Sequence, residues 1–491
     1  MEQYINNAVE QFRAVLTEQI ARQQKMENDS GATDYSKLDK IVIGICYGDG
    51  IGPIISKESK RLLEFVLKDE IASGKVELRV IEGLTIENRI AKNKAIPDDV
   101  LAELKACNVI LKAPTTTLKG GSLESANVAM RRELDLYANV RPVCVPEQNI
   151  DWTFYRENTE GEYVLGSRGI EIPDTLAMDF KVTTNAGTKR ICRAAFEFAK
   201  KNGKTNVAIV TKANIMKKTD GKFSEIAHEI AKDYPEITAE EWYIDIMTAN
   251  LVNENIRSNF QVFVMPNLYG DIITDEAAQI QGGVGTAGSA NIGDKYAMFE
   301  PIHGTAPRLI EAGRGDYANP TSMFKATEMM LRHIGFIEKA NKLNKALNIC
   351  TETEKKIVVD DSEQSATCSQ FGDYLMETIT NMLKGIDISH WQSNFDNFSG
   401  IDFAIIKATE GVGYKDPAFD TLYQRAKNSG KLLGVYHFAR PDLNNSAIAE
   451  ADWFIKVVRP YVREAILVLD WESGYLGNVS WAKAFLDRVK E

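Results

Sequence analysis

The chain has 491 residues, with 58 Lys and Arg against 69 Asp and Glu, so its formal net charge is −11. A hydrophobic fraction of 44% and a charged fraction of 26% exclude a wholly disordered, collagen-like or membrane-embedded chain. The acidic balance also disfavours nucleic acid as a partner, and no window approaches the roughly 18 consecutive apolar residues that span a bilayer. At about 100 to 200 residues per domain, the length predicts two to four packed units.

The N-terminal segment has the pattern of an amphipathic helix. Its apolar residues are three or four positions apart, the spacing of one helical face: Ile5, Val9, Phe12, Leu16 and Ile20. We expect this helix to dock on another surface and to be followed by a polar linker, which together make up residues 1–36. The segment lacks the basic and apolar regions of a secretory signal. The six cysteines have no paired spacing, which predicts reduced thiols in a cytoplasmic protein.

After the linker, short apolar runs alternate with helical segments. Five runs have the composition of buried strands: KIVIGICY (40–47), VELRVIEG (76–83), NVILKAP (108–114), NVAIVTK (206–212) and QVFVMPN (261–267). Strands that are separated by helices predict an α/β fold with a largely parallel sheet.

The pattern changes again near residue 385. The helical run FGDYLMETITNMLK is followed by four new β runs, GIDISHWQ, FAIIKATEG, LLGVYHFA and AILVLDWE. Helical spacing follows each run, which predicts four βα units in a C-terminal segment, 385–491. No stretch rich in Gly, Ser or Pro separates this segment from the preceding helix, and the two parts share no internal repeat.

The segment NLYGDIITDEAAQ carries two carboxylates four residues apart, Asp271 and Asp275. On a helix that begins near Gly270, both lie on one face, about one turn apart. Two hard oxygen ligands suit Mg²⁺ or Mn²⁺, which keeps water or substrate oxygens as further ligands. The alternative is a helix N-terminus whose acidic residues complement the helix dipole.

A second group consists of arginines. Arg131 and Arg141 lie in SLESANVAMRRELDLYANVRPV, and Arg156 lies in FYRENTEGEY. Arginine binds carboxylates through two parallel hydrogen bonds, so these residues are candidates to bind an anionic substrate. The alternative is a solvated helix face with ion pairs, which we expect for Arg132.

Residues 37–384 resemble the metal-dependent decarboxylating dehydrogenases of the isocitrate and 3-isopropylmalate family. Six blocks carry the resemblance in the family order: GDGIGP (48–53), ANVAMRRELDLYANVRPV (126–143), RENTEGEY (156–163), TKANIMK (211–217), NLYGDIITD (267–275) and HGTAP (303–307). The family's dinucleotide site lies away from GDGIGP, so that block is not interpreted as a Rossmann glycine loop. The resemblance implies a two-lobed fold, with a large lobe at about 37–136 and 282–384 and a small lobe at about 137–281.

The resemblance also implies a mechanism. Lys212 matches the lysine that removes the proton of the substrate hydroxyl, and Tyr163 matches the tyrosine that protonates the enol after CO₂ is lost. Asp245, Asp271 and Asp275 match the ligands of the Mg²⁺ or Mn²⁺ ion, which stabilises the developing charge as a Lewis acid. Lys212 and Asp245 come from the neighbouring subunit in this family. The resemblance therefore implies a homodimer or larger assembly with shared active sites.

Two polar residues before Arg131 indicate the substrate. Isocitrate enzymes resemble this sequence in having a Ser and an Asn two apart, here Ser125 and Asn127, which hold the γ-carboxylate. Isopropylmalate enzymes have apolar residues there, and a buried hydrogen-bonding group without a partner costs about 1–3 kcal/mol. Isocitrate is therefore the expected substrate, with isopropylmalate or homoisocitrate as the alternative. Sequence alone gives Glu124 no role.

The cofactor that the resemblance implies is NAD or NADP. Eight residues match family contacts to it: Thr116, Asn214, His303, Gly304, Thr305, Ala306, Arg308 and Asn319. Arg308 favours the 2′-phosphate of NADP. Glu311 and the acidic strip VVDDSEQSATCSQF (358–371) repel that phosphate, so we favour NAD.

The C-terminal segment carries carboxylates at strand ends: Asp387 in the first run, and Asp470 and Glu472 in the fourth. A parallel barrel uses such residues for acid catalysis on a glycosidic bond, although strand ends are also commonly polar. The segment resembles the N-terminal half of the Chalaropsis-type lysozymes, glycoside hydrolase family twenty-five, which cut peptidoglycan. Trp391, Tyr436 and Trp471 match aromatic wall residues.

Because the chain ends after four units, the expected structure is an incomplete (β/α) barrel with open strand edges. The missing strands argue against muramidase activity, and we interpret the segment as an appendage. The alternatives are peptidoglycan muramidase activity or cell-wall binding through this segment, and a noncatalytic regulatory member of the dehydrogenase family. The presence of Lys212, Tyr163 and all three aspartates argues against the regulatory alternative.

Overall fold

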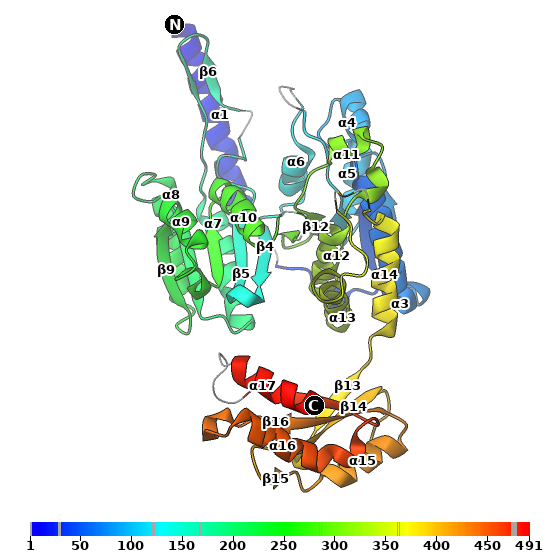
Figure 1. Cartoon of the computed structure of the whole chain (residues 1–491). Coiled ribbons are helices and arrows are strands. Elements are labelled where there is room, and N and C mark those ends of the chain that lie inside the picture. The colour runs from blue at the N-terminus through cyan, green and yellow to red at the C-terminus, as the bar shows by residue number, and fades with distance from the viewer. Residues whose placement is uncertain are drawn as a thin grey trace. The chain divides into compact units, whose positions relative to one another are not determined.

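The computed structural model describes residues 2–27, 31–118, 123–165, 168–283, 285, 287–360, 362, 364–472 and 479–491. They form two compact units, Met1–Thr380 and Asn381–Glu491, which Figure 1 colours from blue to yellow and from yellow to red. No helix among the described residues is long and apolar enough to cross a bilayer. All six cysteines are free, and five of them are buried.

The first unit contains twelve strands and fourteen α-helices in its described residues. The strands are β1 (Ile41–Cys46), β2 (Val76–Ile81), β3 (Val109–Lys112), β4 (Ala138–Val145), β5 (Ile150–Glu157), β6 (Ile170–Ile172), β7 (Leu176–Met178), β8 (Asn206–Thr211), β9 (Thr238–Tyr243), β10 (Val262–Met265), β11 (Gly288–Ile292) and β12 (Ala297–Pro301). The helices are α1 (Glu2–Glu27), α2 (Gly52–Val66), α3 (Lys68–Ala72), α4 (Ile86–Lys92), α5 (Asp98–Lys105), α6 (Ala126–Glu133), α7 (Asn185–Lys201), α8 (Thr219–Ala231), α9 (Ile244–Val252), α10 (Asn267–Ile280), α11 (Pro307–Glu311), α12 (Thr321–His333), α13 (Ile337–Asn348) and α14 (Cys368–Asn381).

Ten of these strands form one sheet in the order β2-β1-β3-β12-β11-β4-β5-β10-β8-β9. The two outer parts are parallel, whereas the central pairs β12–β11, β11–β4 and β4–β5 are antiparallel. The prediction of a largely parallel α/β sheet is therefore confirmed, and its five strands correspond to β1, β2, β3, β8 and β10. The antiparallel centre was not predicted.

Alternating side chains of β8 and β10 bury both faces of the sheet. On one face, Val207 and Val262 pack with the apolar residues of α7 and α8. On the other face, Ala208 and Phe263 pack with α9 and α10. Because successive strand residues point to opposite faces, a strand that is covered on both sides must be apolar throughout. This is why these strands were recognisable as continuous apolar runs.

The predicted N-terminal helix is α1. It packs beside the β6–β7 hairpin, and the rings of Phe12 and Phe180 lie 5.6 Å apart. The side-chain amide of Gln11 donates to the carbonyl oxygens of Arg168 and Gly169 at 2.9 and 3.0 Å. An apolar groove remains between helix and hairpin, and Ile5, Val9 and Phe12 are still about half exposed.

The second unit contains a parallel sheet in the order β13-β14-β16-β17, with β15 antiparallel beside β14. Its elements are β13 (Gly385–Ile388), β14 (Phe403–Glu410), β15 (Tyr414–Lys415), α15 (Phe419–Asn428), β16 (Leu432–Phe438), α16 (Ala447–Val458), β17 (Ile466–Asp470) and α17 (Val479–Lys490). One expectation is wrong: β13 is followed by a three-residue 3-10 helix, His390–Gln392, and not by an α-helix. Ser389 and Gln392 form a capping box at the N-terminus of that single turn.

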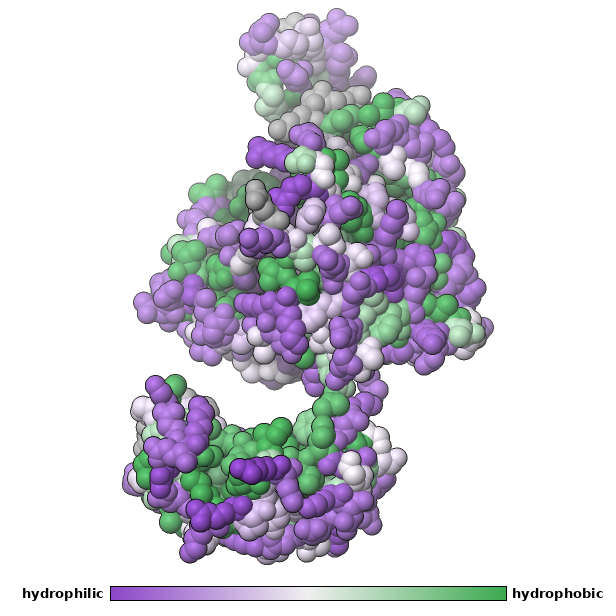
Figure 2. Space-filling model, turned by 45° about the vertical axis from the view of Figure 1, so that its right-hand side comes forward, coloured by the Kyte–Doolittle hydropathy of each residue, from purple (hydrophilic) through white to green (hydrophobic). Residues whose placement is uncertain are grey.

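One face of this second sheet packs against its helices through Ala404, Ile406 and Val435. Leu432 and Ile466, by contrast, are 60% and 74% exposed. Figure 2 shows apolar residues gathered on an open face of this unit. A barrel uses such residues to line its interior, so this sheet presents a partly uncovered apolar surface.

Candidate active site

Asp271 is the centre of the predicted site in the first unit. It lies in the second turn of α10 and accepts hydrogen bonds from Nη1 of Arg156 and, at 2.6 Å, from the hydroxyl of Tyr163. Nη2 of Arg141 lies 4.0 Å away. Burial alone favours the protonated acid, but the charge of Arg156 and the bond from Tyr163 outweigh it and lower the pKa of Asp271. The carboxylate is therefore ionised at neutral pH.

Asp275 lies one turn further along α10, on the same face as Asp271. Its carboxylate accepts a 2.7 Å hydrogen bond from Nη1 of Arg141, which also binds Thr274 at 2.7 Å. The helix begins at Asn267, one turn before Gly270, but the expected pairing of the two carboxylates on one face holds. In this structure the two proposed metal-binding aspartates are bound by two of the proposed substrate-binding arginines.

The arginines reach this place from adjacent antiparallel strands. Arg141 lies on β4 and Arg156 on β5. The side chain of Arg156 is 1% exposed, and Nε and Nη2 both donate to Oδ1 of Asn267, at 3.1 and 2.7 Å. Burial and the neighbouring charge of Arg131 lower the pKa of Arg156 to about 10. The three arginines therefore share one electrostatic environment, which spacing alone could not show.

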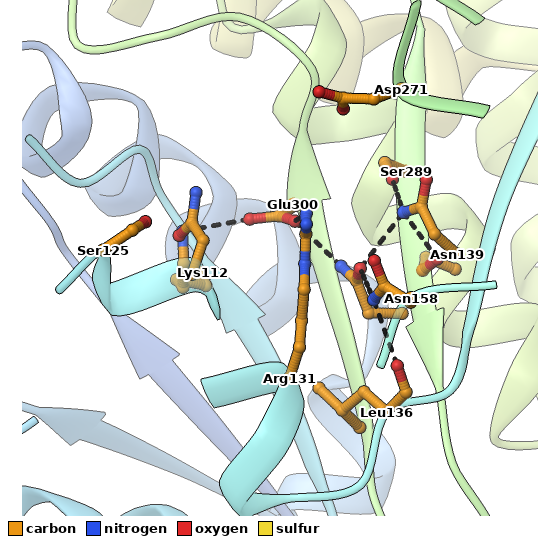
Figure 3. A network of polar contacts seen from close by, with 12 residues as sticks. Lys112, Ser125, Arg131, Leu136, Asn139, Asn158, Asp271, Ser289 and Glu300 are labelled. Atoms are coloured by element: carbon orange, nitrogen blue, oxygen red, sulfur yellow. Dashed lines mark hydrogen bonds and ion pairs between the residues drawn. The ribbon is translucent and has the colours of Figure 1, made fainter. Parts of the chain in front are cut away.

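A buried carboxylate holds the third arginine. Glu300, on β12, lies 3.3 Å from Nη2 of Arg131 and 3.0 Å from Nζ of Lys112, and it accepts a 2.8 Å bond from Asn291. Burial opposes its ionisation, but the charges of Lys112 and Arg131 lower the pKa of Glu300 to about 2. Asn291 in turn accepts a 2.9 Å bond from the side-chain amide of Asn158, and Figure 3 shows Glu300, Arg131, Lys112 and Asn158 in this network.

Two of these arginines keep a free donor. Among the described residues, Nε of Arg131 and Nε of Arg141 are buried and have no hydrogen-bond partner. Leaving a buried donor unpaired costs about 1–3 kcal/mol, so an anionic ligand that accepts these bonds recovers that free energy. Arg132, by contrast, is bound by Glu124 at 2.5 and 3.0 Å. This matches the ion pair expected for Arg132 and gives Glu124 a role.

Ser125 and Asn127 lie at the start of α6. Ser125 is the residue before the helix, and its hydroxyl oxygen lies 3.4 Å from that of Thr117. The side-chain carbonyl of Asn127 accepts a 3.1 Å bond from Thr115. No hydrogen bond joins Ser125 or Asn127 to the three arginines in the described part of the chain. Ser125 therefore directly precedes the helix that carries Arg131, and Asn127 lies in its first turn.

Lys212 and Asp245 form a separate pair, with Nζ of Lys212 2.6 Å from Oδ1 of Asp245. The hydrogen bond from Lys212 lowers the pKa of Asp245. Within the described residues, no hydrogen bond or ion pair joins this pair to Asp271 or Asp275. The described residues also contain no group of three or more His, Cys, Asp or Glu side chains that could hold a metal ion, so Asp245 lies apart from Asp271 and Asp275 in this chain.

The proposed cofactor residues lie mainly in one loop region. Nε2 of His303 is buried and has no hydrogen-bond partner among the described residues, and burial lowers the pKa of His303. A neutral imidazole is therefore available to a ligand. The side-chain amide of Asn319 donates to the carbonyl of Val359 at 3.0 Å. This bond ties the loop after HGTAP to the acidic strip at 358–371. Asp361 and Glu363 of that strip lie outside the described residues.

The remaining proposed cofactor residues surround this loop or lie apart from it. Thr305 accepts a bond at its carbonyl from the amide of Ile51, and Ala306 has a positive φ of 47° just before α11. Arg308 is exposed on α11, Gly304 faces open space, and Asn214 is exposed beside Lys212. The main chain of Thr116 is held by Asp49 and Arg89.

The block GDGIGP has a structural role in the packing of two loops. The side chain of Asp49 accepts the amides of Ile86 at 2.8 Å and Thr116 at 2.7 Å. Gly50 has a φ of +58°, and a Cβ there would lie 2.2 Å from the carbonyl oxygen of Thr305. The glycine is required because this turn packs directly on the HGTAP loop. This packing role is consistent with a block that is not a dinucleotide-binding loop.

In the second unit, the three proposed acids form a cluster around Tyr436. Burial, then the charges of Glu472 and Asp387, raise the pKa of Asp470 to about 6. Burial and the same carboxylates also raise the pKa of Tyr436. The predicted wall residue Trp391 is 81% exposed. The three acids therefore influence one another's ionisation, and of the expected wall residues Tyr436 is buried whereas Trp391 is exposed.

Two residues of the first site were not predicted, Lys112 and Glu300. Each lies within an apolar strand, Val109–Lys112 or Ala297–Pro301. A charged residue inside a run that otherwise reads as a buried strand must be paired, and this signal would have found both. The partner of each could not be inferred, because Lys112 and Glu300 are far apart in the sequence.

Comparison with known proteins gives two family matches. The family model described as isocitrate/isopropylmalate dehydrogenase matches residues 42–375, and that described as glycosyl hydrolases family 25 matches residues 386–491. Both resemblances predicted from sequence motifs are thereby confirmed.

Individual relatives are similar to the first unit. The "Isocitrate dehydrogenase [NADP]" of Rickettsia prowazekii is 42% identical over 305 residues, 60% of this chain and 59% of the relative. The "Isocitrate dehydrogenase [NAD] subunit 2, mitochondrial" of Schizosaccharomyces pombe is 38% identical over 310 residues, 61% of this chain and 77% of the relative. The crystal structure of isocitrate dehydrogenase from Methylococcus capsulatus is 32% identical with a TM-score of 0.62, and the match covers 69% of this chain and 99% of that chain. The chain spans about three-fifths of the length of the first of these curated relatives.

Proposed function

Because the chain belongs to the isocitrate/isopropylmalate dehydrogenase family, we propose that it oxidises and decarboxylates isocitrate to 2-oxoglutarate and CO₂, with reduction of NAD or NADP. The observation that carries the proposal is the set of three arginines beside Asp271, Asp275 and Glu300. Within the described residues, Nε of Arg131 and Nε of Arg141 have no hydrogen-bond partner. Such a site accepts an anion with several carboxylates together with a cation. The test is isocitrate-dependent formation of NADH or NADPH with Mg²⁺ or Mn²⁺ present.

Different residues of this chain bind the substrate and transfer protons. Arg131, Arg141 and Arg156 bind and orient the substrate carboxylates through forked hydrogen bonds. Lys212, in its neutral amine form, accepts the proton of the substrate hydroxyl as the hydride leaves for the nicotinamide. Tyr163 returns a proton to carbon after CO₂ departs. Burial and the hydrogen bond to Asp271 raise the pKa of Tyr163 to about 12, so its hydroxyl keeps its proton at neutral pH until that step.

The acidic residues fit a divalent cation. Asp271 and Asp275 present oxygen donors on one helix face, and Asp245 supplies a third. A cation such as Mg²⁺ or Mn²⁺ bound there would stabilise negative charge on the substrate oxygen as a Lewis acid. In the structure Arg141 and Arg156 pair with these two carboxylates. If the carboxylates held such a cation, both arginines would be available to bind the substrate.

Each complete site requires two chains in this proposal. Lys212 and Asp245 lie in one cluster, and Asp271 with its arginines lies in another, with no hydrogen bond or ion pair between the clusters in the described ranges. Apolar side chains near both clusters are exposed, including Ile215, Ile246 and Ile272. A homodimer that buries these side chains would bring Lys212 and Asp245 of one protomer to Asp271 and Asp275 of its partner.

Substrate choice is assigned to Ser125 and Asn127. Replacing Asn127 with leucine removes a hydrogen bond to the γ-carboxylate, and a bond to a charged group contributes about 1.5–3 kcal/mol. We expect kcat/KM for isocitrate to fall about 10- to 100-fold, while kcat/KM for isopropylmalate rises. Steady-state kinetics of both substrates measure this change. Asn348→Leu, on the surface of α13, is the matched control, and equal effects of the two substitutions would contradict the assignment.

For the cofactor, NAD is the favoured proposal. Arg308 on α11 is exposed and would suit a 2′-phosphate, but Glu311 lies on the same short helix. Asp360 belongs to the strip that Asn319 ties to this loop. Carboxylates near the adenosine ribose disfavour a phosphate. A lower KM for NADP than for NAD would reverse this choice.

The second unit is proposed to be separable from this activity, since every dehydrogenase residue lies within Met1–Thr380. Removing residues 385–491 is expected to leave kcat and KM for isocitrate unchanged within the error of the assay. A large loss of turnover would show that the unit is integral to the enzyme. The full chain and the shortened chain should be compared at equal concentrations of folded protein.

The same two proteins test a second candidate function, hydrolysis or binding of peptidoglycan. It is favoured by the cluster of Asp387, Asp470 and Glu472, because an acid with a raised pKa is what glycosidic cleavage needs. Lysis of a cell-wall suspension by the full chain alone would support hydrolysis. Co-sedimentation with the walls without lysis would support binding. If neither lysis nor co-sedimentation is observed, the second unit is an appendage without this function.

A further inference from the structure

The end of helix α1 contacts the turn that leads to Tyr163. Nη1 of Arg22 lies 3.0 Å from Oε1 of Glu160, and Nη2 donates to the hydroxyl of Thr159, also at 3.0 Å. The next residue, Gln23, accepts a 2.9 Å bond from the amide of Ala186 in the first turn of α7. Arg22 thus joins a helix outside the family match at 42–375 to a block inside it.

Arg22 meets a pair of buried acids. The side chains of Glu157 and Glu160 are 2% and 3% exposed. Glu157 accepts the amides of Thr159 and Glu160 at 3.0 and 2.5 Å, and Glu160 accepts the amide of Thr184 at 2.9 Å. Burial and the neighbouring charge of Glu160 raise the pKa of Glu157. Two neighbouring carboxylates that are both buried from solvent require a compensating cation.

Arg22 is the one cation that bonds either acid directly in the described part of the chain. Arg190 is also near, but its guanidinium is held by both oxygens of Asp135 at 2.6 and 2.8 Å and lies over the ring of Tyr137. Arg190 reaches only the hydroxyl of Thr159, at 3.1 Å. Among the described residues, Glu160 would therefore have no ion pair without Arg22.

The same turn carries the proposed proton donor. Residues 157–163 run from the end of β5, directly after Arg156, to Tyr163. The carbonyl of Glu160 accepts a 3.0 Å bond from Asn267, which also holds Arg156. A shift of the turn would therefore move Tyr163 relative to Asp271, whereas Arg156 keeps its own bonds to Asn267 and Asp271.

We propose that Arg22 is a positioning residue, which holds the 157–163 turn through Glu160 and Thr159 and thereby keeps Tyr163 in place for the last proton transfer. The inference rests on the proposed function, because it assigns Arg22 to one step of that reaction. Arg22 does not touch the substrate site, so substrate binding and hydride transfer do not depend on it. The step that depends on it is the return of a proton to carbon.

The test compares Arg22→Met with Arg13→Met, an exposed arginine on the same helix. For Arg22→Met, kcat is expected to fall about 10- to 100-fold, since small misplacements of a reacting group have effects of this size, with little change in KM for isocitrate. The solvent deuterium isotope effect on kcat should rise, because proton transfer becomes rate limiting. Arg22→Lys should restore part of kcat, and Arg13→Met should match the unmodified chain.

Hydrogen exchange gives a readout that needs no turnover. The amides of Thr159 and Glu160 donate to Glu157, so both should exchange faster in Arg22→Met than in Arg13→Met. An unmodified chain that does not turn over isocitrate refutes the proposed function and leaves this exchange test in force. Unchanged exchange at both amides overturns the inference. An active chain whose Arg22→Met variant keeps its kcat and isotope effect also overturns it.

Discussion

Replacement of Lys212 with methionine is expected to lower kcat for isocitrate oxidation by about 10²–10⁴-fold, the usual contribution of a positioned proton-transfer group. Methionine keeps the length and apolar stem of the side chain but cannot accept a proton. The structure places Nζ of Lys212 2.6 Å from Oδ1 of Asp245, so the lysine lies directly beside one of the proposed metal-binding residues. Rapid-quench or steady-state measurement of reduced cofactor gives the rate.

The matched control for Lys212→Met is Lys217→Met, an exposed lysine at the end of the same loop. Binding of isocitrate with Mn²⁺, measured by calorimetry, should survive Lys212→Met, because the arginines and two of the aspartates are untouched. Retained turnover in Lys212→Met would remove this residue from the mechanism. Loss of both turnover and binding would instead indicate that Lys212 acts by holding Asp245.

Replacement of Asp271 with asparagine is the second change with a large expected effect. The carboxylate of Asp271 joins Arg156, Tyr163 and, more distantly, Arg141, and an amide supplies neither its charge nor its second acceptor oxygen. A lost charge-assisted interaction of about 1.5–3 kcal/mol should raise the Mn²⁺ concentration for half-maximal activity about 10- to 100-fold. Titration of activity with Mn²⁺ at saturating isocitrate measures it.

The control for Asp271→Asn is Glu276→Gln, a carboxylate further along α10 that takes part in none of these contacts. Its Mn²⁺ dependence should equal that of the unmodified chain. The thermal midpoint of both variants separates a metal effect from a folding effect. An unchanged Mn²⁺ dependence in a folded Asp271→Asn variant would refute the proposed metal site.

The outer parts of the large sheet were predictable because their strands are buried on both faces and read as unbroken apolar runs. The central strands could not be predicted in this way, because β4 and β11 carry polar residues. Asn139 on β4 bonds Ser289 and Asn291 on β11 at 2.8 and 3.1 Å. Polar side chains that pair across strands hide those strands from a pattern based on hydrophobicity.

The candidate site was predictable in its chemistry and not in its connections. The i, i+4 spacing of Asp271 and Asp275 correctly placed both carboxylates on one helix face. The pairing of Arg141 with Asp275, and of Arg131 with Glu300, depends on how distant strands and helices pack. Periodicity carries no such information. The contact of Arg22 with Glu160 is of the same kind, since it joins positions 138 residues apart.

In the second unit, the segment after β13 also differs from the structure that its sequence pattern predicted. Helical spacing after GIDISHWQ predicted an α-helix, but the structure has a single 3-10 turn there, His390–Gln392, with a capping box of Ser389 and Gln392. His390 then turns toward Asp416, with 2.7 Å between Nδ1 and Oδ2. A tertiary partner, invisible in the local pattern, determines where this segment leads.

The central claim is that isocitrate is the substrate. The most direct measurement follows absorbance of reduced nicotinamide while the purified full-length chain, with Mn²⁺, receives isocitrate or 3-isopropylmalate and either NAD or NADP. We expect rapid reduction with isocitrate, a higher kcat/KM with NAD than with NADP, and little reduction with isopropylmalate. Reduction with isopropylmalate in preference to isocitrate, or none with isocitrate under any of these conditions, would contradict the claim.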